Sequence, residues 1–97
     1  MITIYKYELN LGPNKVMLPY DAKVLSVAGQ HNNLVMWVEV DTERPLWDNW
    51  FLVTLTGHAI VDNFHPREFI GTVLLDNETF ILHVFKYRPD PVHKEAQ

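Results

Sequence analysis

Apolar residues recur at every second position over much of this chain, a pattern that predicts β-strands with one buried face. The run 34–41 shows it best, with the apolar set Leu34, Met36, Val38 and Val40. The residues between them become acidic towards the end of the run, as expected where the second face meets solvent. The run 50–56 divides in the same way, into Phe51, Val53 and Leu55 on one face and Trp50, Leu52, Thr54 and Thr56 on the other.

The last apolar run, 79–87, differs because both of its faces are largely apolar. One face carries Phe80, Leu82 and Val84, and the other carries Ile81, His83 and Phe85. This pattern predicts a strand that is buried on both faces or that lies in an oligomer contact.

Short polar segments between the apolar runs predict two β-hairpins. The predicted hairpins are 22–29 with 34–41 through the turn 29–33, and 69–75 with 79–87 through the turn 76–78. A first strand is expected at 2–9, followed by a turn at 12–14, and a short additional strand at 15–18 raises the count from six to seven. The stretch 42–49, which contains Pro45, is expected to be an exposed loop, and 66–69 a single helical turn.

These elements predict an all-β fold, a compact antiparallel β-sandwich or small barrel of about six to seven strands with at most one short helical turn. Residues 1–88 are expected to form a single domain. Two prolines and a polar end predict a flexible tail at 89–97.

Composition narrows the function classes. The chain has 97 residues, of which 47% are apolar, and a net charge of −4. It has no cysteine, which excludes disulfides, zinc–thiolate sites and cysteine nucleophiles. The acidic balance opposes binding to nucleic acid or to an anionic membrane. No apolar run approaches the roughly 18 residues of a membrane span, and the N-terminus lacks signal-peptide features, so a cytosolic protein is expected.

Chemistry-bearing residues gather after the run 50–56, in a segment that contains Thr56, Gly57, His58, Asp62, His65 and Arg67. One interpretation is a polar loop in which His58 serves as general base and Asp62 orients it. The other, which we favour, is that His58 caps a strand end through local hydrogen bonds. The spacing of seven between His58 and His65 matches no ligand pattern, and we expect no metal and no cofactor.

Two tryptophans flank a polar turn in the sequence Trp47-Asp48-Asn49-Trp50. We expect Trp50 to belong to the core and Trp47 to be partly exposed. An exposed tryptophan beside polar groups is typical of an interaction hot spot or a base-stacking platform. The alternative is an aromatic residue that folds back over the end of the sandwich.

The first strand carries Tyr5 and Tyr7 on one face and Ile2 and Ile4 on the other. The tyrosines are either the inward set or an exposed aromatic face on an edge strand that is available to another chain.

Enzyme motifs are missing from the chain. Its four glycines are scattered, so no phosphate-binding loop is present, and its single serine, Ser26, lies inside a predicted strand. We therefore expect a protein that is not an enzyme.

Several segments, taken in order, resemble a family of small uncharacterised proteins of bacteriophages and prophages. They are the opening 1–7, Leu18-Pro19 with 22–27, Trp37, Thr56-Gly57-His58 with Ile60 and Asp62, 69–73, and His83-Val84-Phe85. The resemblance implies a phage origin and a location in the host cytoplasm, and it transfers no catalytic residue. Differences from relatives are expected after Tyr87 and around Trp47–Trp50.

These observations lead to three functional hypotheses. The first is a non-enzymatic phage accessory protein that binds another protein, such as a host factor, and self-associates. The second is a protein that binds or sequesters a nucleotide signal, with Trp47 or Tyr5 stacking on the base and Arg44, Arg67 and Lys23 on phosphate. The third is a small hydrolase built around His58 and Asp62.

Overall fold

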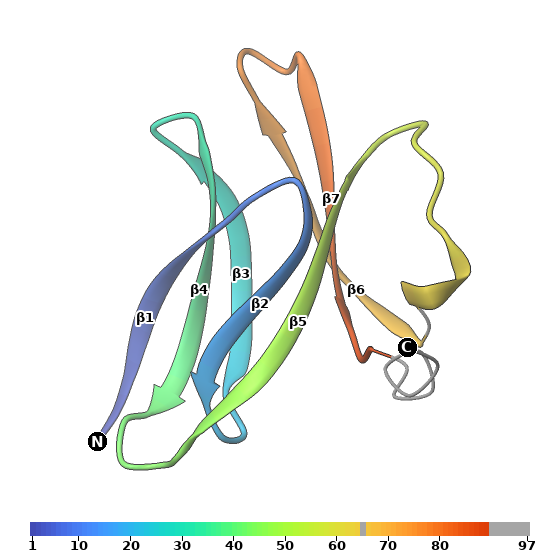
Figure 1. Cartoon of the computed structure of the whole chain (residues 1–97). Helices are drawn as coiled ribbons and strands as arrows, with labels where there is room; N and C mark the ends of the chain where they lie inside the picture. Colours follow the sequence, from blue (N-terminus) through green and yellow to red (C-terminus); the bar gives the residue numbers. More distant parts are fainter. Residues whose placement is uncertain (65, 90–97) are drawn as a thin grey trace.

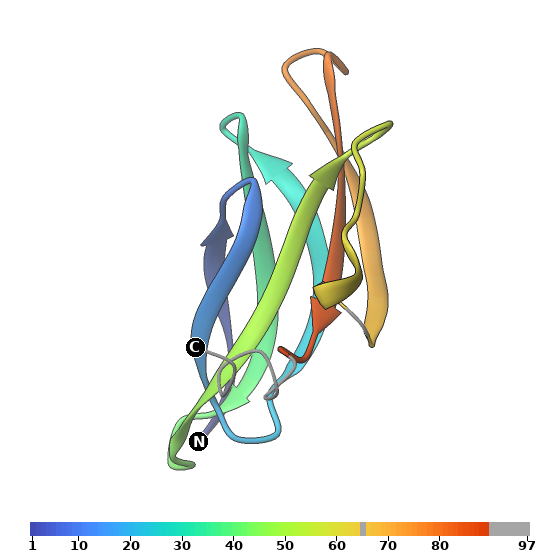
Figure 2. The same ribbon diagram turned by 45° about the vertical axis from the view of Figure 1, so that its right-hand side comes forward.

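The computed structural model describes residues 1–64 and 66–89 and contains seven strands in two antiparallel sheets that face one another (Figures 1 and 2). The first sheet has the order β1 (Ile2–Leu9), β4 (Asn33–Asp41), β3 (Lys23–Gln30). The second has the order β2 (Gly12–Pro19), β5 (Leu46–Leu55), β7 (Phe80–Tyr87), β6 (Arg67–Leu75). The prediction of an all-β fold is confirmed.

The core lies between the two sheets and is built from the inward side chains that the alternation predicts. Its fully buried members are Leu18, Met36, Val38, Val40, Phe51, Val53 and Val84. The inward set predicted for 34–41 is buried in full, and Leu55 packs against the core from the end of β5. One face of each sheet therefore supplies the apolar area that stabilises the fold.

The two sheets approach most closely where β3 meets β6, and glycines make this approach sterically feasible. A Cβ at Gly71 would lie 2.8 Å from Val27 Cγ2, and one at Gly29 would lie 2.6 Å from Leu75 Cδ2. At the end of these strands, the backbone N–H of Asp76 donates to Asn32 Oδ1 at 2.7 Å. No strand ladder joins β3 to β6, so the structure is a sandwich and not a closed barrel.

Both predicted hairpins are confirmed. β3 pairs with β4 and β6 pairs with β7. Their turns contain the non-glycine residues with positive φ His31, Asn32, Asp76, Asn77 and Glu78. Asn and Asp adopt this conformation more readily than most residues, which agrees with the turn chemistry read from the sequence.

The prediction of an exposed loop at 42–49 is wrong in its second half. β5 begins at Leu46 and pairs with β2 from its first residue, with Leu46 opposite Pro19 and Trp47 opposite Leu18. The short strand predicted at 15–18 is in fact the eight-residue β2, which supplies the partner that extends β5. Pro45 ends the shortened loop, where its carbonyl accepts a hydrogen bond from the Tyr20 N–H at 2.8 Å.

Two smaller predictions about local structure are also wrong. The helical turn expected at 66–69 is part of β6, and a single 3₁₀ turn, η1, lies just before it at Asp62–Phe64. The turn expected at 12–14 lies earlier, because Gly12 already begins β2. Asn14 holds that earlier turn by accepting from the Asn10 N–H at 2.9 Å and donating to the Asn10 carbonyl at 2.8 Å.

β7 is buried on its core face and partly covered on the other, where Tyr87 is also buried, so the prediction of burial on both faces is confirmed only in part. Leu82 and Val84 lie in the core, whereas Ile81 on the other face is 37% exposed and Phe85 is half-buried. His83 lies between them, hydrogen-bonded to Thr56 Oγ1 at 2.6 Å and Thr72 Oγ1 at 3.0 Å.

The predicted flexible tail, apart from Pro89, lies outside the described residues. Within the described part of the chain, no helix has the length and apolar character needed to cross a membrane.

Candidate functional site

A hollow of about 320 Å³ lies at the end of the sandwich where β2 turns into β3, β5 begins and β7 ends. We call it the tryptophan pocket. It is lined by Tyr20, Asp21, Ala22, Trp47, Asp48, Asn49, Trp50, Lys86, Tyr87 and Arg88. Three residues that the sequence singled out, Trp47, Asp48 and Trp50, thus line one pocket.

Trp47 is the most exposed aromatic residue of this pocket, at 59%. It has the strand parity of the buried Phe51 and stands opposite the buried Leu18, yet its own side chain remains largely exposed. The Tyr20 ring contacts it edge-on, with ring centroids 5.5 Å apart and planes at 76°. Trp47 therefore packs against one neighbour and presents most of its surface to solvent, so it is partly exposed as expected.

Trp50 lies on the outer face of its sheet, so the expectation that it belongs to the core is wrong. Phe51 is the residue that points inward, and Trp50 is half-buried opposite Tyr87, with ring centroids 6.2 Å apart. Lys15 Nζ lies 5.9 Å from the Trp50 ring centroid, a cation–π contact. On the other side, Phe64 of η1 meets the Tyr87 ring at 5.0 Å, and burial raises the pKa of the Tyr87 phenol.

Charged side chains of both signs line the pocket and the groove beside it. The pocket has Asp21, Asp48, Lys86 and Arg88, and the groove of about 550 Å³ adds Lys23, Glu39 and Glu68. Pocket and groove share Asp21, Ala22 and Lys86, so they form one continuous depression. Within residues 1–64 and 66–89, none of these charged groups belongs to an ion pair. In the strand ladders, however, Lys23 stands opposite Glu39 and Glu68 stands opposite Lys86, so charges of opposite sign are neighbours along the groove.

The remaining residues singled out from the sequence lie elsewhere. Tyr7 is half-buried against the core, and burial first, then the neighbouring Tyr5, raises its phenolic pKa. Tyr5 is 45% exposed on β1, which is an edge strand. Tyr7 is therefore turned inward, whereas Tyr5 stays exposed on the same strand, which is an edge.

The Thr56-Gly57-His58 segment forms a turn at the end of β5. Gly57 has a φ of 86°, and the His58 N–H donates to the Leu55 carbonyl at 3.1 Å. This hydrogen bond is made by the His58 backbone and does not involve the imidazole ring. His58 faces a separate hollow of about 310 Å³ whose other lining residues carry no ionisable side chain.

The other members of that predicted group are found as follows. Asp62 begins η1, His65 lies outside the described residues, and Arg67 lies on β6 with its guanidinium 5.5 Å from the Phe85 ring centroid. Among the residues that the structure describes, no group of three His, Asp or Glu side chains is placed to hold a metal ion.

The sequence reasoning missed Tyr20, Lys86, Tyr87 and Arg88. Tyr20 had a signal, because an aromatic residue between Pro19 and Asp21 at a turn is exposed with no apolar neighbour in sequence. The other three gave none, because their place in the pocket follows from the pairing of β7 with β5.

Fold and pocket together define a small two-sheet β domain with an aromatic, mixed-charge depression at one end. The chain belongs to the family described as a domain of unknown function, DUF7352, whose model matches residues 1–95. Comparison with curated proteins finds no match, and comparison with solved structures finds none either.

Proposed function

We propose that this protein is a non-enzymatic binding module that docks a segment of another protein in the tryptophan pocket. The observation that carries the proposal is an exposed tryptophan at the rim of a pocket that continues into a charged groove. Trp is among the residues most enriched at the energetic centre of protein interfaces.

The shape and chemistry of the depression fit an extended peptide. An apolar side chain of the partner fits against Trp47 and Tyr20, and the polar residues that follow it reach the charged side chains around Lys86. A ligand of this kind uses the aromatic pocket and the groove together, whereas a compact ligand would use one of them.

The charge balance favours a peptide over a nucleotide, the second candidate ligand. Aromatic rings and the cations Lys86 and Arg88 in one pocket are the observation that supports a nucleotide. However, the pocket and groove together contain Asp21, Glu39, Asp48 and Glu68 against Lys23, Lys86 and Arg88. The acidic groups oppose the binding of phosphate, because no cation excess balances its charge.

The biological setting of the proposal rests on the resemblance to phage proteins. In that setting the chain is a phage accessory protein, and its partner is a host factor in the host cytoplasm. An acidic protein with a net charge of −4 suits a partner with a basic surface.

Site-specific photo-crosslinking tests the proposal. A photoreactive amino acid replaces Trp47 in one variant and Phe80 in the control, since Phe80 is also exposed, at 47%, but begins β7 and lines neither the tryptophan pocket nor the groove. We expect a protein adduct from position 47 and not from position 80. With the partner identified and purified, Trp47→Ala should weaken binding by about 30-fold or more, as hot-spot residues do.

Two results would overturn the proposal. One is a set of adducts that is the same at both positions, and the other is a partner whose affinity is unchanged by Trp47→Ala. Native mass spectrometry of the purified protein separates the second candidate, because a retained small molecule that is released on unfolding would support nucleotide binding.

A further inference from the structure

β1 is an edge strand whose outer backbone groups are free to pair with another strand. It hydrogen-bonds to β4 on one side, and no other strand of the described chain pairs with it. Exposed strand edges of this kind are templates for association.

The other three edge strands have features that block edge pairing. β2 contains Pro13 and Pro19, which cannot donate hydrogen bonds to a new neighbour. β3 has a register shift between Val24 and Ser26, β6 has one between Phe69 and Gly71, and these two strands lie against each other. β1 has neither a proline nor a register shift.

The direction of the free backbone groups follows from one hydrogen bond. The Thr42 N–H donates to the Met1 carbonyl at 2.9 Å, and the register of β1 with β4 places these two residues opposite one another. Hydrogen-bonded and non-bonded pairs alternate along an antiparallel ladder. The odd-numbered residues of β1 therefore bond to β4, and the backbone groups of Ile2, Ile4, Lys6 and Glu8 point to the free edge.

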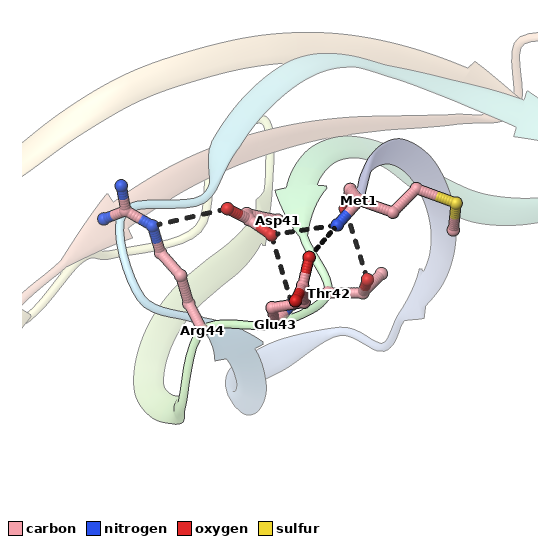
Figure 3. A network of polar contacts seen from close by, with 5 residues as sticks. All are labelled: Met1, Asp41, Thr42, Glu43 and Arg44. Atoms are coloured by element: carbon pink, nitrogen blue, oxygen red, sulfur yellow. Dashed lines mark hydrogen bonds and ion pairs between the residues drawn. The ribbon is translucent and has the colours of Figure 1, made fainter.

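Two local contacts hold this edge in an extended form and direct the Lys6 side chain away from it. The Met1 amine lies 3.3 Å from Asp41 Oδ1 and 2.8 Å from Glu43 Oε2, which fixes the start of β1 beside the end of β4 (Figure 3). Lys6 Nζ donates to Gln30 Oε1 on β3 at 2.7 Å. Since β4 lies between β1 and β3, Lys6 extends across the sheet and away from the free edge.

We propose that two copies of this chain pair through β1, antiparallel about a two-fold axis at Tyr5, so that their three-stranded sheets join into one. In this register the even-numbered residues of β1 form about eight inter-chain hydrogen bonds. Lys6 stands opposite Ile4 of the second copy and Glu8 opposite Ile2. A two-fold axis at Lys6 or at Glu8 would place like charges opposite one another, which is unfavourable.

The register also accounts for the exposure of Tyr5. The two Tyr5 rings would meet on the axis, and cross-strand aromatic pairs stabilise antiparallel sheets. The tryptophan pocket is formed by the β2–β3 turn with β5 and β7, so its binding function does not depend on this pairing.

Sedimentation velocity from about 1 μM to about 1 mM tests the proposal over the usual affinity range of weak dimers. We expect a species of twice the 11.4 kDa chain mass. Ile4→Pro removes an outward N–H and should give a monomer, whereas Ile4→Ala, which keeps that N–H, should remain a dimer.

Charged substitutions of Tyr5, the residue on the two-fold axis, test the register. They also test the pairing through β1 if the Ile4→Pro variant does not fold. Tyr5→Lys and Tyr5→Glu should each weaken the dimer by about tenfold or more, and their mixture should form a heterodimer. A monomer throughout the concentration range overturns the proposal. The proposal is also overturned if neither Tyr5 variant weakens the dimer. It is overturned as well if a mixture of the two variants does not form a heterodimer.

Discussion

Gly71 and Val27 are expected to be energetically coupled across the two sheets, and Gly71→Ala measures that coupling. The added Cβ would lie 2.8 Å from Val27 Cγ2, well inside the roughly 3.5–4.0 Å at which carbon atoms pack. Val27 packs against the core, and its branched side chain has one strongly preferred rotamer in most backbone settings. The clash is therefore relieved only if β3 and β6 move apart.

The size of the effect follows from two opposing contributions. Overpacking of this kind costs about 1–3 kcal/mol. Replacing glycine by alanine recovers about 0.4–1 kcal/mol through the entropy of the unfolded chain. The free energy of unfolding should thus fall by about 1–2 kcal/mol, which for a small domain lowers Tm by roughly 5–10 °C.

The assay is a double-mutant cycle by chemical denaturation. Val27→Ala removes the methyl group that the new Cβ meets, so the double variant should be more stable than the two single effects predict by about 1 kcal/mol. Gly29→Ala is the control. Its nearest contact, 2.6 Å away, is the terminal methyl of Leu75, which can rotate aside, so we expect a smaller loss. If the changes in the free energy of unfolding for Gly71→Ala and Val27→Ala add to within about 0.3–0.5 kcal/mol in the double variant, the proposed coupling between Gly71 and Val27 is refuted.

Phe51→Ala should lower the free energy of unfolding by about 3–5 kcal/mol, because the ring is fully buried and its removal leaves a cavity. A decrease of less than about 1 kcal/mol in a denaturant titration would contradict the place of Phe51 in the core. His83→Ala should cost about 1–2 kcal/mol by the same assay, since the ring bonds to hydroxyls on both sides, and His83→Gln should recover part of the loss. Stability should also depend on pH at both limits. The Glu43 backbone N–H, and next the Met1 amine, lower the pKa of Asp41 from its ordinary 3.8, so this contribution is present above pH 3.8 and is lost as pH falls through the lowered value. The Glu43 carboxylate, and next Asp41, raise the pKa of the amine from 8.0, so that contribution is present below pH 8.0 and is lost as pH rises through the raised value. Asp41→Asn should flatten the acid side of the profile, and an unchanged acid side would contradict the assignment.

The alternation of apolar residues predicts the fold well because burial between two sheets imposes a period of two. The inward residues of β4 and of β5 from Phe51 onward follow it without exception. It does not predict which strands pair, since β2 with β5 and β5 with β7 are contacts between segments far apart in sequence. For that reason Leu46 and Trp47 were assigned to a loop, although β2 holds them in a strand.

The candidate site was predictable where its residues follow one another in sequence, at Trp47, Asp48 and Trp50, and not where it depends on other strands. Trp47 stood out because a large aromatic residue beside polar ones is unusual whatever the fold. Lys86 gave no signal, because its place in the pocket depends on where β7 ends relative to β5. Trp50 was misplaced for a related reason, since a one-residue difference in strand parity separates the core from the outer face.

The positions of the prolines in the sequence indicate which edge strands are protected against pairing. Pro13 belongs to the turn expected at 12–14, yet both Pro13 and Pro19 lie in β2, where they are tolerated because β2 is an edge strand. The same reasoning applies in reverse to β1, an edge of equal length with no proline and with even-numbered N–H groups that point outwards. An edge without such protection would expose the chain to uncontrolled strand addition, unless a partner of defined register covers it. Self-pairing about Tyr5 supplies that partner from the same sequence, and it limits the assembly to two copies because each contributes a single free edge of this kind.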